Sequence, residues 1–366
     1  MKKAPMAKSS DRPTDSNSQH SGAVQAGFPS WPEIPGYEES AVFALHAQLL
    51  FTQWMESGFF QHLQLRQLEN LLRFSHQNSL YYQGALNFLE TLPVGGLYEG
   101  HLTQLPILTF DEVQKNSQKI FVRNRPANHG RSQLVRVSNP SGQKVKIIVT
   151  GLVNTWSGAL ALRSQEWNDT DVSMTHLRMG YSAGLESSSS GRWSALPWSG
   201  PSTDLSPDMT TRELFRKLVQ LDPGSLQAPP NVLQSLLEHS TSEGYKPPNL
   251  REVRCRGRSL NPELRTMAEK VWGLSIFHEY FLDEIGVIAL QCPEGGNLHI
   301  QSEYIFVEVL NDDNSPCHPG QTGRVIVTPL HNYQTPLIRY ETGDRAEAGE
   351  PCACGRTLPV LKRIVA

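Results

Sequence analysis

The feature that most constrains this chain is an alternation of strand and helix patterns between residues 145 and 291. Short apolar runs such as Val145–Val149 predict strands, and amphipathic stretches such as Glu213–Leu221 predict helices. Alternating strands and helices imply an α/β sheet covered by helices. After residue 295 short strands follow one another between turns, which predicts a small β-rich unit.

Periodicity, turn residues and capping residues predict the individual elements. Helices are expected over most of 39–88, after a Thr or Asp cap near 109–111, over 151–165, 213–221 and 231–238, and from 261 onward. Strands are expected at 133–137, 145–149, 250–255, 274–277, 287–291, 298–300, 305–310 and 323–328, with a loop at 184–206.

Composition excludes several classes of protein. A chain of 366 residues with 38% hydrophobic residues can bury a sizeable core, and its net charge of −3 lacks the basic field that a nucleic-acid partner needs. It contains no apolar run of the roughly 18 residues that a membrane helix needs, and we expect no secretory signal because no apolar stretch follows the first lysines. Five cysteines, an odd number, favour a reducing, cytoplasmic setting. Residues 1–28 are polar enough to predict a disordered tail.

The C-terminal third carries a series of motifs in a fixed order. These motifs are Tyr280–Gly286, Gly320–Arg324, Pro336–Asp344, Cys352–Arg356 and Leu361–Ile364. Their order and spacing resemble the adenylate-forming superfamily, within it the branch of phenylacetate–CoA ligase and coenzyme F390 synthetase. The resemblance covers roughly residues 60 to 366.

The resemblance implies the α/β fold of the adenylate-forming large domain, with layered αβα subdomains and a small β-rich subdomain. It divides the chain into the tail at 1–28, a nucleotide-binding region at 29–295 and a β-rich subdomain at 296–366. In the family a lid domain with a catalytic lysine follows the hinge, and we expect it to be absent here. Either a separate protein supplies the lid, or the chain is a shortened product, or the fold only binds.

The same resemblance assigns the nucleotide contacts. Asp344, after Thr342 and Gly343, would accept hydrogen bonds from the ribose hydroxyls, together with Arg363. Tyr280 would stack on adenine, and Glu284 would be a catalytic residue that holds Mg²⁺ near the phosphates. Without the resemblance, Thr342–Asp344 is a common surface turn, Tyr280 a core aromatic and Glu284 a solvated helix start.

The phosphate loop is the weaker match. By position, Ser138, Ser141 and Gly142 would contact phosphates, and Lys144 would supply a catalytic point charge to them. Pro140 removes a backbone donor that such a loop uses. A plain hairpin turn is the alternative for this segment.

Two further departures from the family pattern affect the site. Phe281 replaces a glycine, which changes how closely the backbone can approach a ligand. Arg258 stands where many relatives carry a glutamate, so it either rebalances the charge of the site or is a surface substitution without consequence.

Cysteine and histidine residues also suggest a zinc site. The candidates are Cys352 and Cys354, Cys317 with His318, Cys292 and His331. A single C-x-C is not the usual C-x₂₋₄-C spacing of structural zinc. The Cys-rich glycine turn is therefore interpreted first as part of the family motif.

Two hypotheses about function follow. The first is an ATP- and Mg²⁺-dependent ligase that activates a small carboxylic acid and passes it to CoA or a carrier thiol. The second is a catalytically degenerate homologue that acts as a binding or scaffold subunit. The expected partners are the acid, a separate lid or carrier protein and a second copy in a homodimer, with neither nucleic acid nor membrane.

Overall fold

The computed structural model describes residues 34–138, 142–180 and 192–365. Residues Pro35–Ala366 form one compact unit. The tail expected at 1–28 lies outside the described residues, and the boundary expected at 295 stays a prediction. Among the described helices, none combines the length and the apolar character needed to cross a bilayer.

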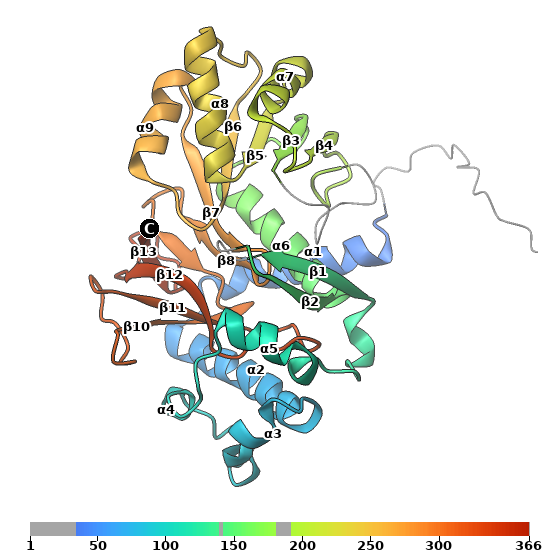
Figure 1. The fold of residues 1–366 in the computed structure, drawn as a ribbon, viewed down its shortest axis with the longest axis vertical. Helices are drawn as coiled ribbons and strands as arrows, with labels where there is room; N and C mark the ends of the chain where they lie inside the picture. Colours follow the sequence, from blue (N-terminus) through green and yellow to red (C-terminus); the bar gives the residue numbers. More distant parts are fainter. Residues whose placement is uncertain (1–33, 139–141, 181–191, 366) are drawn as a thin grey trace, which may run out of the picture. The chain divides into compact units, whose positions relative to one another are not determined.

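A large mixed sheet of described strands organises the unit, in the order β10-β11-β12-β13-β9-β8-β7-β6-β5-β3-β4 (Figure 1). The pairings from β4 to β7 are parallel, and those from β7 to β10 are antiparallel. The separate strands β1 and β2 pair antiparallel. The strands are β1 (Ser132–Ser138), β2 (Lys144–Thr150), β3 (His176–Met179), β4 (Ser202–Leu205), β5 (Ser225–Ala228), β6 (Glu252–Gly257), β7 (Ile276–Leu282), β8 (Gly286–Gln291), β9 (Leu298–Ile300), β10 (Ile305–Leu310), β11 (Thr322–Pro329), β12 (Tyr340–Ala348) and β13 (Val360–Val365).

Helices precede and connect these strands. The described helices are α1 (Tyr37–Thr52), α2 (Ser57–Asn78), α3 (Tyr82–Ala85), η1 (Asn87–Glu90), α4 (Glu99–Leu102), α5 (Phe110–Ile120), η2 (Ala127–His129), α6 (Gly151–Trp167), α7 (Thr211–Leu221), α8 (Pro230–Glu243) and α9 (Pro262–Val271).

The parallel half has the pattern of an α/β unit. All residues of β5 and the first five of β6 are buried, as expected for strands covered on both faces. Helix α8 packs on β6 and against α9, and the pair lies in front of the sheet in Figure 1. Asn261 caps α9 by accepting a hydrogen bond from the Leu264 N–H, and Pro262 occupies the first helical position.

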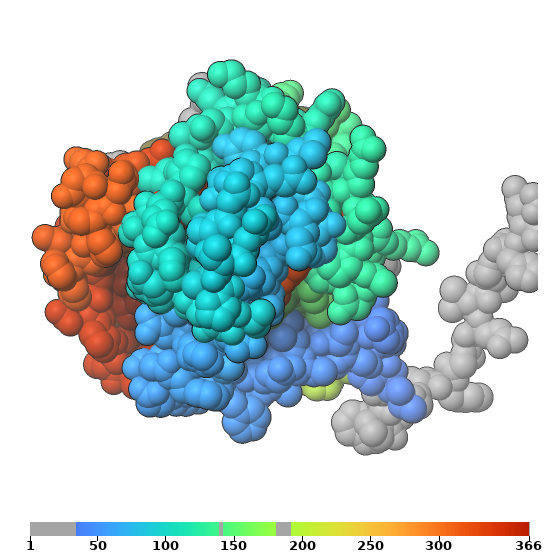
Figure 2. Space-filling view, turned by 90° about the horizontal axis from the view of Figure 1, so that it is seen from below, coloured from blue at the N-terminus to red at the C-terminus, as the bar shows by residue number. Residues whose placement is uncertain are grey.

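The helices between residues 37 and 120 share a hydrophobic core with the antiparallel half of the sheet. Leu68, Leu71 and Leu72 of α2 are fully buried, at the spacing of one helical face. Thr109 and Glu112 form a capping box at the start of α5, which confirms the cap expected there. Figure 2 shows these helices, coloured blue to teal, over the face seen from below.

Several expectations about single elements were wrong. The segment 184–206, expected to be a loop, contains β4 at residues 202–205, parallel to β3; residues 181–191 lie outside the described residues. Strands β3, β5, β12 and β13 were also not expected from the sequence. β3, β4 and β5 are four residues long, and β12 and β13 mix charged with apolar residues, so none has a period that a short window detects.

Candidate functional site

Three of the predicted nucleotide residues, Tyr280, Glu284 and Asp344, lie together with Arg258 at the carboxyl ends of β6 and β7. Arg258 follows β6, Tyr280 lies near the end of β7, and Glu284 lies in the turn between β7 and β8. Asp344 reaches the same place from β12, since it bonds to Tyr280 and to Arg258. Ligands of open α/β sheets bind at this edge, beyond the carboxyl ends of parallel strands.

A β-bulge in β12 aims Asp344 at this edge. The register between β11 and β12 shifts so that Thr342, Gly343 and Asp344 lie opposite Val325 alone. Gly343 has φ of +78°, which a residue with a side chain adopts only with strain. The hydroxyl of Thr342 donates to the Val325 carbonyl oxygen (3.1 Å) and accepts from the Asp344 N–H (3.1 Å). The segment is therefore not the tight turn that the sequence suggested but a bulge inside a strand, and bulges re-aim side chains in this way.

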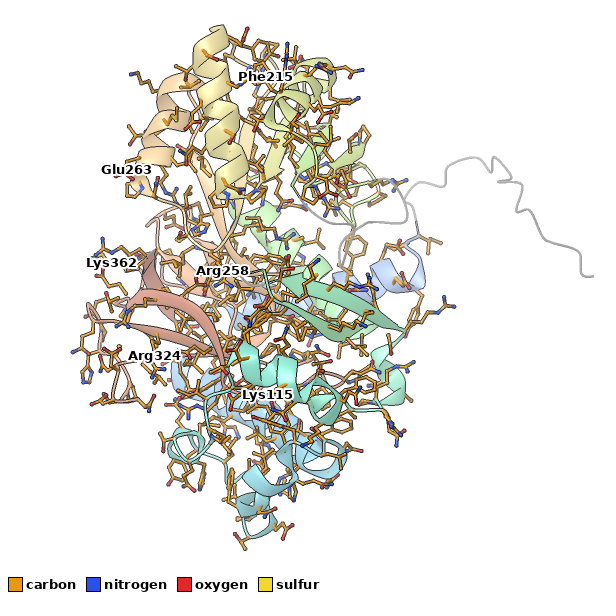
Figure 3. The ribbon with its side chains drawn as sticks, viewed as in Figure 1. Lys115, Phe215, Arg258, Glu263, Arg324 and Lys362 are labelled. Carbon is orange, nitrogen blue, oxygen red and sulfur yellow. The ribbon has the colours of Figure 1, made fainter. Side chains whose placement is uncertain are left out.

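Both oxygens of the Asp344 carboxylate have partners in this structure. Arg258 Nη1 donates to Oδ1 (2.9 Å), and the Tyr280 hydroxyl donates to Oδ2 (2.8 Å). Arg258 Nη1 also donates to the Thr342 carbonyl oxygen (2.7 Å). The guanidinium, labelled in Figure 3, thus binds both ends of the bulge, and its position is part of the site.

Tyr280 is enclosed on all sides. Its exposed fraction is 0%, and it belongs to the main hydrophobic core. Burial, followed by the charge of Asp344, holds the pKa of Tyr280 well above its usual value, so the phenol stays protonated and remains a donor. Stacking on adenine therefore requires a movement that opens one face of this ring.

Glu284 is a buried carboxyl group. Its exposed fraction is 7%, so the interpretation as a solvated helix start is wrong. The Tyr340 hydroxyl donates to Oε1 (3.0 Å). Burial raises the pKa of Glu284, although a backbone N–H and the charge of Arg258 act in the opposite direction. One carboxylate fits a Mg²⁺ ion whose other ligands are phosphate oxygens and water.

The β1–β2 hairpin carries the predicted phosphate contacts. Ser138 pairs with Lys144 in register, and Gly142 has φ of +81°. All three residues are exposed, and the Gln114 side chain of α5 donates to the Lys144 carbonyl oxygen (3.0 Å). Ser141 lies outside the described residues. The antiparallel hairpin is confirmed as a structure, and its contact with phosphate stays a prediction.

Arg363 lies on β13 opposite Glu347, with 70% of its side chain exposed. Its Nε donates to the Glu347 carboxylate (2.8 Å). The structure thus pairs Arg363 with Glu347, three residues along β12 from Asp344. A shared role of Arg363 and Asp344 at a ribose stays a prediction that needs this side chain to turn.

The cysteine and histidine candidates separate into two sets. Cys292, Cys352 and Cys354 lie together with His299, a residue that the sequence analysis did not consider. Two of the other candidates lie elsewhere, since Cys317 donates to Asn311 and His331 stacks on Trp156 (4.3 Å between ring centroids). His299 is seven residues from Cys292 and 53 residues from Cys352 in the sequence, so it falls outside the short C-x₂₋₄-C spacing by which such sites are detected.

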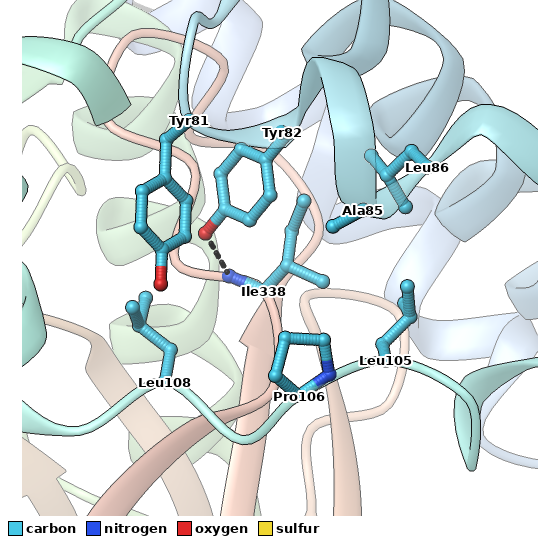
Figure 4. A pocket seen from close by; sticks show the side chains of 8 residues that line it. All are labelled: Tyr81, Tyr82, Ala85, Leu86, Leu105, Pro106, Leu108 and Ile338. Carbon is cyan, nitrogen blue, oxygen red and sulfur yellow. Dashed lines mark hydrogen bonds between the residues drawn. The ribbon is translucent and has the colours of Figure 1, made fainter.

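A small apolar pocket lies beside the segment that leads into β12 (Figure 4). The Tyr82 hydroxyl closes one side by accepting from the Ile338 N–H (3.2 Å) and donating to the Pro336 carbonyl oxygen (2.9 Å). Its lining residues are Tyr81, Tyr82, Ala85, Leu86, Leu105, Pro106, Leu108 and Ile338. None of these is a predicted site residue.

Comparison with known proteins shows what this fold is similar to. No family model matches the chain. A phenylacetate–coenzyme A ligase of Thermus thermophilus is 30% identical over 161 residues, which are 42% of this chain and 36% of the ligase. A crystal structure of 2-hydroxyisobutyryl-CoA ligase in the postadenylation state, in complex with 2-HIB-AMP, superposes with a TM-score of 0.69 over 85% of this chain and 68% of that one, at 15% identity. The chain is thus similar in sequence to a phenylacetate–CoA ligase over less than half of its length, and it has the fold of an acyl-CoA ligase that forms an adenylate.

The structural likeness confirms the predicted fold class. A second structure of the 2-hydroxyisobutyryl-CoA ligase, an open conformation with 2-HIB-AMP and CoA, gives a TM-score of 0.65 over 85% of this chain. At 15% identity these structures establish the fold alone. The sequence match spans little more than a third of the Thermus ligase.

Proposed function

We propose that this chain activates a carboxylic acid as an acyl-adenylate, with ATP and Mg²⁺. A carboxylate oxygen attacks the α-phosphorus of ATP, the bond to the β-phosphate oxygen breaks, and pyrophosphate leaves. In a second step a thiolate of CoA or of a carrier attacks the acyl carbon, and AMP leaves with the electron pair of the broken bond. The proton of the thiol passes to solvent.

One observation carries this proposal. Asp344 lies 64 residues from Tyr280 in the sequence, yet it meets Tyr280 and Glu284 at the carboxyl ends of parallel strands. The fold around them is that of a ligase whose structure holds an acyl-adenylate, 2-HIB-AMP. Carboxylates and an aromatic ring at this edge suit a ribose, a base and a phosphate-bound metal ion.

The proposed roles follow the geometry. Asp344 accepts hydrogen bonds from the ribose hydroxyls, since a carboxylate offers about four lone-pair positions and two are used by Arg258 and Tyr280. Tyr280 covers the adenine once its ring is uncovered. Glu284 shares Mg²⁺ with phosphate oxygens.

The hairpin would supply the remaining phosphate contacts. Ser138, Ser141 and Gly142 contact the phosphates in this proposal, and Lys144 balances the negative charge that they carry. Catalysis would then come from positioning and electrostatics. The acid, the acceptor thiol, a lid protein and a homodimer stay predictions.

A second candidate function is binding without catalysis. The observation in its favour is that Arg258 and Tyr280 bond to both oxygens of Asp344, while the Tyr280 ring is completely buried. A nucleotide must displace or rearrange these contacts, which costs binding free energy. A homologue that has lost catalysis and serves as a scaffold would keep such a self-contained network.

Pyrophosphate release with a panel of aryl and aliphatic acids tests the two candidates. We expect acid-dependent release by the wild-type chain, and its loss in Asp344→Ala. The matched control is Asp312→Ala, because Asp312 is 81% exposed at its side chain and forms only a surface ion pair with Arg345 (3.1 Å). Calorimetry with ATP and Mg²⁺ on the same variants reports nucleotide binding separately.

Three results would decide the question. Release that Asp344→Ala abolishes and Asp312→Ala preserves supports the ligase. Binding of ATP without release for any acid supports the scaffold. Wild-type protein that is folded and yet gives no heat with ATP and Mg²⁺ contradicts the nucleotide site itself.

A further inference from the structure

Four potential metal ligands lie close together where β8, β9 and the β12–β13 connection meet. Cys292 follows β8, His299 lies in the middle of β9, and Cys352 and Cys354 lie in the connection between β12 and β13. Their ligand atoms all lie within 4.8 Å of one another. Cys292, His299 and Cys352 are buried, and Cys354 is half-buried.

The distances match a tetrahedral site. Zinc binds thiolate sulfur at about 2.3 Å, so two sulfurs at the corners of a tetrahedron lie about 3.8 Å apart. The Sγ atoms of Cys292 and Cys352 are separated by 3.8 Å. With zinc–nitrogen bonds of about 2.0 Å, a sulfur and an imidazole nitrogen should lie about 3.5 Å apart. The distance from Cys354 Sγ to His299 Nε2 is 3.3 Å.

Both cysteine segments have the backbone of a metal-binding turn. Gly296 N–H donates to the Cys292 carbonyl oxygen (3.0 Å), and Gly355 N–H donates to that of Cys352 (3.1 Å). Gly296 and Gly355 have φ of +69° and +82°. A β-carbon at Gly295 would lie 3.1 Å from the sulfur of Cys352, tighter than ordinary contacts. These glycines let two short turns bring their sulfurs together.

Hydrogen bonds to neighbouring residues orient the ligands. His299 Nδ1 lies 3.2 Å from the Leu358 carbonyl oxygen, and this oxygen can only accept, so the proton is on Nδ1. Nε2 is then unprotonated and faces the sulfurs, the arrangement usual for histidine bound to zinc. The Asn297 amide lies 3.6 Å from Cys352 Sγ and donates to it.

We propose that Cys292, His299, Cys352 and Cys354 bind one structural Zn²⁺ ion. Three thiolates and one imidazole complete a tetrahedron, so the site is closed and leaves no position for a substrate. The ion would join the end of β8, the strand β9 and the β12–β13 connection. Its role is to hold the far end of β12, the strand whose bulge carries Asp344.

A competing state of the same residues is a disulfide between Cys292 and Cys352. Their sulfurs need to approach from 3.8 Å to about 2.05 Å for that bond. Counting free thiols in denatured protein without added reductant separates the two states. With zinc all five cysteines remain reduced thiols, whereas a disulfide leaves three.

The test is the metal content of protein purified without chelators from medium supplied with zinc. We expect about one zinc per wild-type chain, which is the stoichiometry of a four-ligand site. Cys354→Ser and His299→Ala should lose it. Cys317→Ser is the matched control, since this cysteine donates to Asn311 outside the cluster, and it should keep the metal.

Wild-type measurements keep the test decisive if the variants do not fold. Exchange of zinc for Co²⁺ should give the sulfur-to-cobalt absorption and the visible bands of a tetrahedral thiolate site. Removal of the metal by a strong chelator should lower the melting temperature. Folded wild-type protein without zinc and without cobalt bands overturns the proposal, as does a count of three thiols or full zinc content in Cys354→Ser.

Discussion

A buried ion pair between α6 and the segment before β10 gives the sharpest prediction about stability. Arg163 is 1% exposed at its side chain, and Glu303 is 9% exposed. Nη2 donates to Glu303 Oε1 (2.7 Å) and to the Leu49 carbonyl oxygen (2.7 Å), while Nη1 donates to Glu303 Oε2 (3.1 Å) and to Gln301 Oε1 (2.8 Å). One guanidinium thus connects α6, the end of α1 and the 301–303 segment.

The substitution Arg163→Met keeps most of the volume and removes the charge. Glu303 then remains buried without its cation, a situation that costs about 3–5 kcal/mol of unfolding free energy. Arg345→Met is the matched control, because that arginine is 44% exposed and its partner Asp312 is 81% exposed. An exposed pair contributes about 0–1 kcal/mol. Urea unfolding at neutral pH, followed by fluorescence, measures both losses.

The loss in Arg163→Met should depend on pH in a defined direction. In the wild type, burial raises the pKa of Glu303, but the charge and hydrogen bonds of Arg163 outweigh it and hold the pKa below the usual value. This contribution to stability is present above the unfolded pKa of about 4.3 and is lost as pH falls through the folded pKa.

In Arg163→Met, burial dominates and the pKa of Glu303 rises above its unfolded value. The carboxylate then costs stability as pH increases through the raised pKa, so the difference from wild type is greatest at neutral pH and shrinks toward about pH 4. The double variant Arg163→Met/Glu303→Gln should recover part of the loss at neutral pH. A loss of unfolding free energy below about 1 kcal/mol, or a loss that is equal at neutral pH and at about pH 4, would contradict this prediction.

Two further predictions concern the candidate site. Glu284→Gln keeps an acceptor for the Tyr340 hydroxyl and removes a carboxylate whose pKa burial raises. The substitution should raise the free energy of unfolding in urea at neutral pH. This gain should vanish below about pH 4, where the wild-type carboxyl group is protonated in the folded and the unfolded state. An equal gain at neutral pH and below about pH 4 would contradict this prediction. Gly343→Ala should cost about 1–2 kcal/mol because φ is +78°, although the added carbon meets open space. Gly84→Ala in α3 is the matched control, because the added carbon also meets open space but Gly84 lacks a positive φ, and it should not lower the free energy of unfolding. Equal losses in the two variants would show that backbone strain at Gly343 is not the cause.

The sequence by itself determined several helix starts and indicated the fold. Thr109 with Glu112, and Asn261 with Pro262, marked the starts of α5 and α9, because a helix start needs side-chain acceptors for its N–H groups. The motif ending at Asp344 indicated the adenylate-forming fold, which the structural comparison confirmed. Such signals are contained within a few neighbouring residues, so they can be detected without a structure.

Only the tertiary structure decided which distant residues meet. It paired the short, polar strands β3 and β4, converted the expected turn at Gly343 into a bulge, and buried Glu284. It brought Arg258 to Asp344 across 86 residues of sequence, and His299 to three cysteines that spacing alone had not joined. Burial, register and ligand geometry arise from contacts between segments far apart in the chain, and no local pattern of residues encodes them.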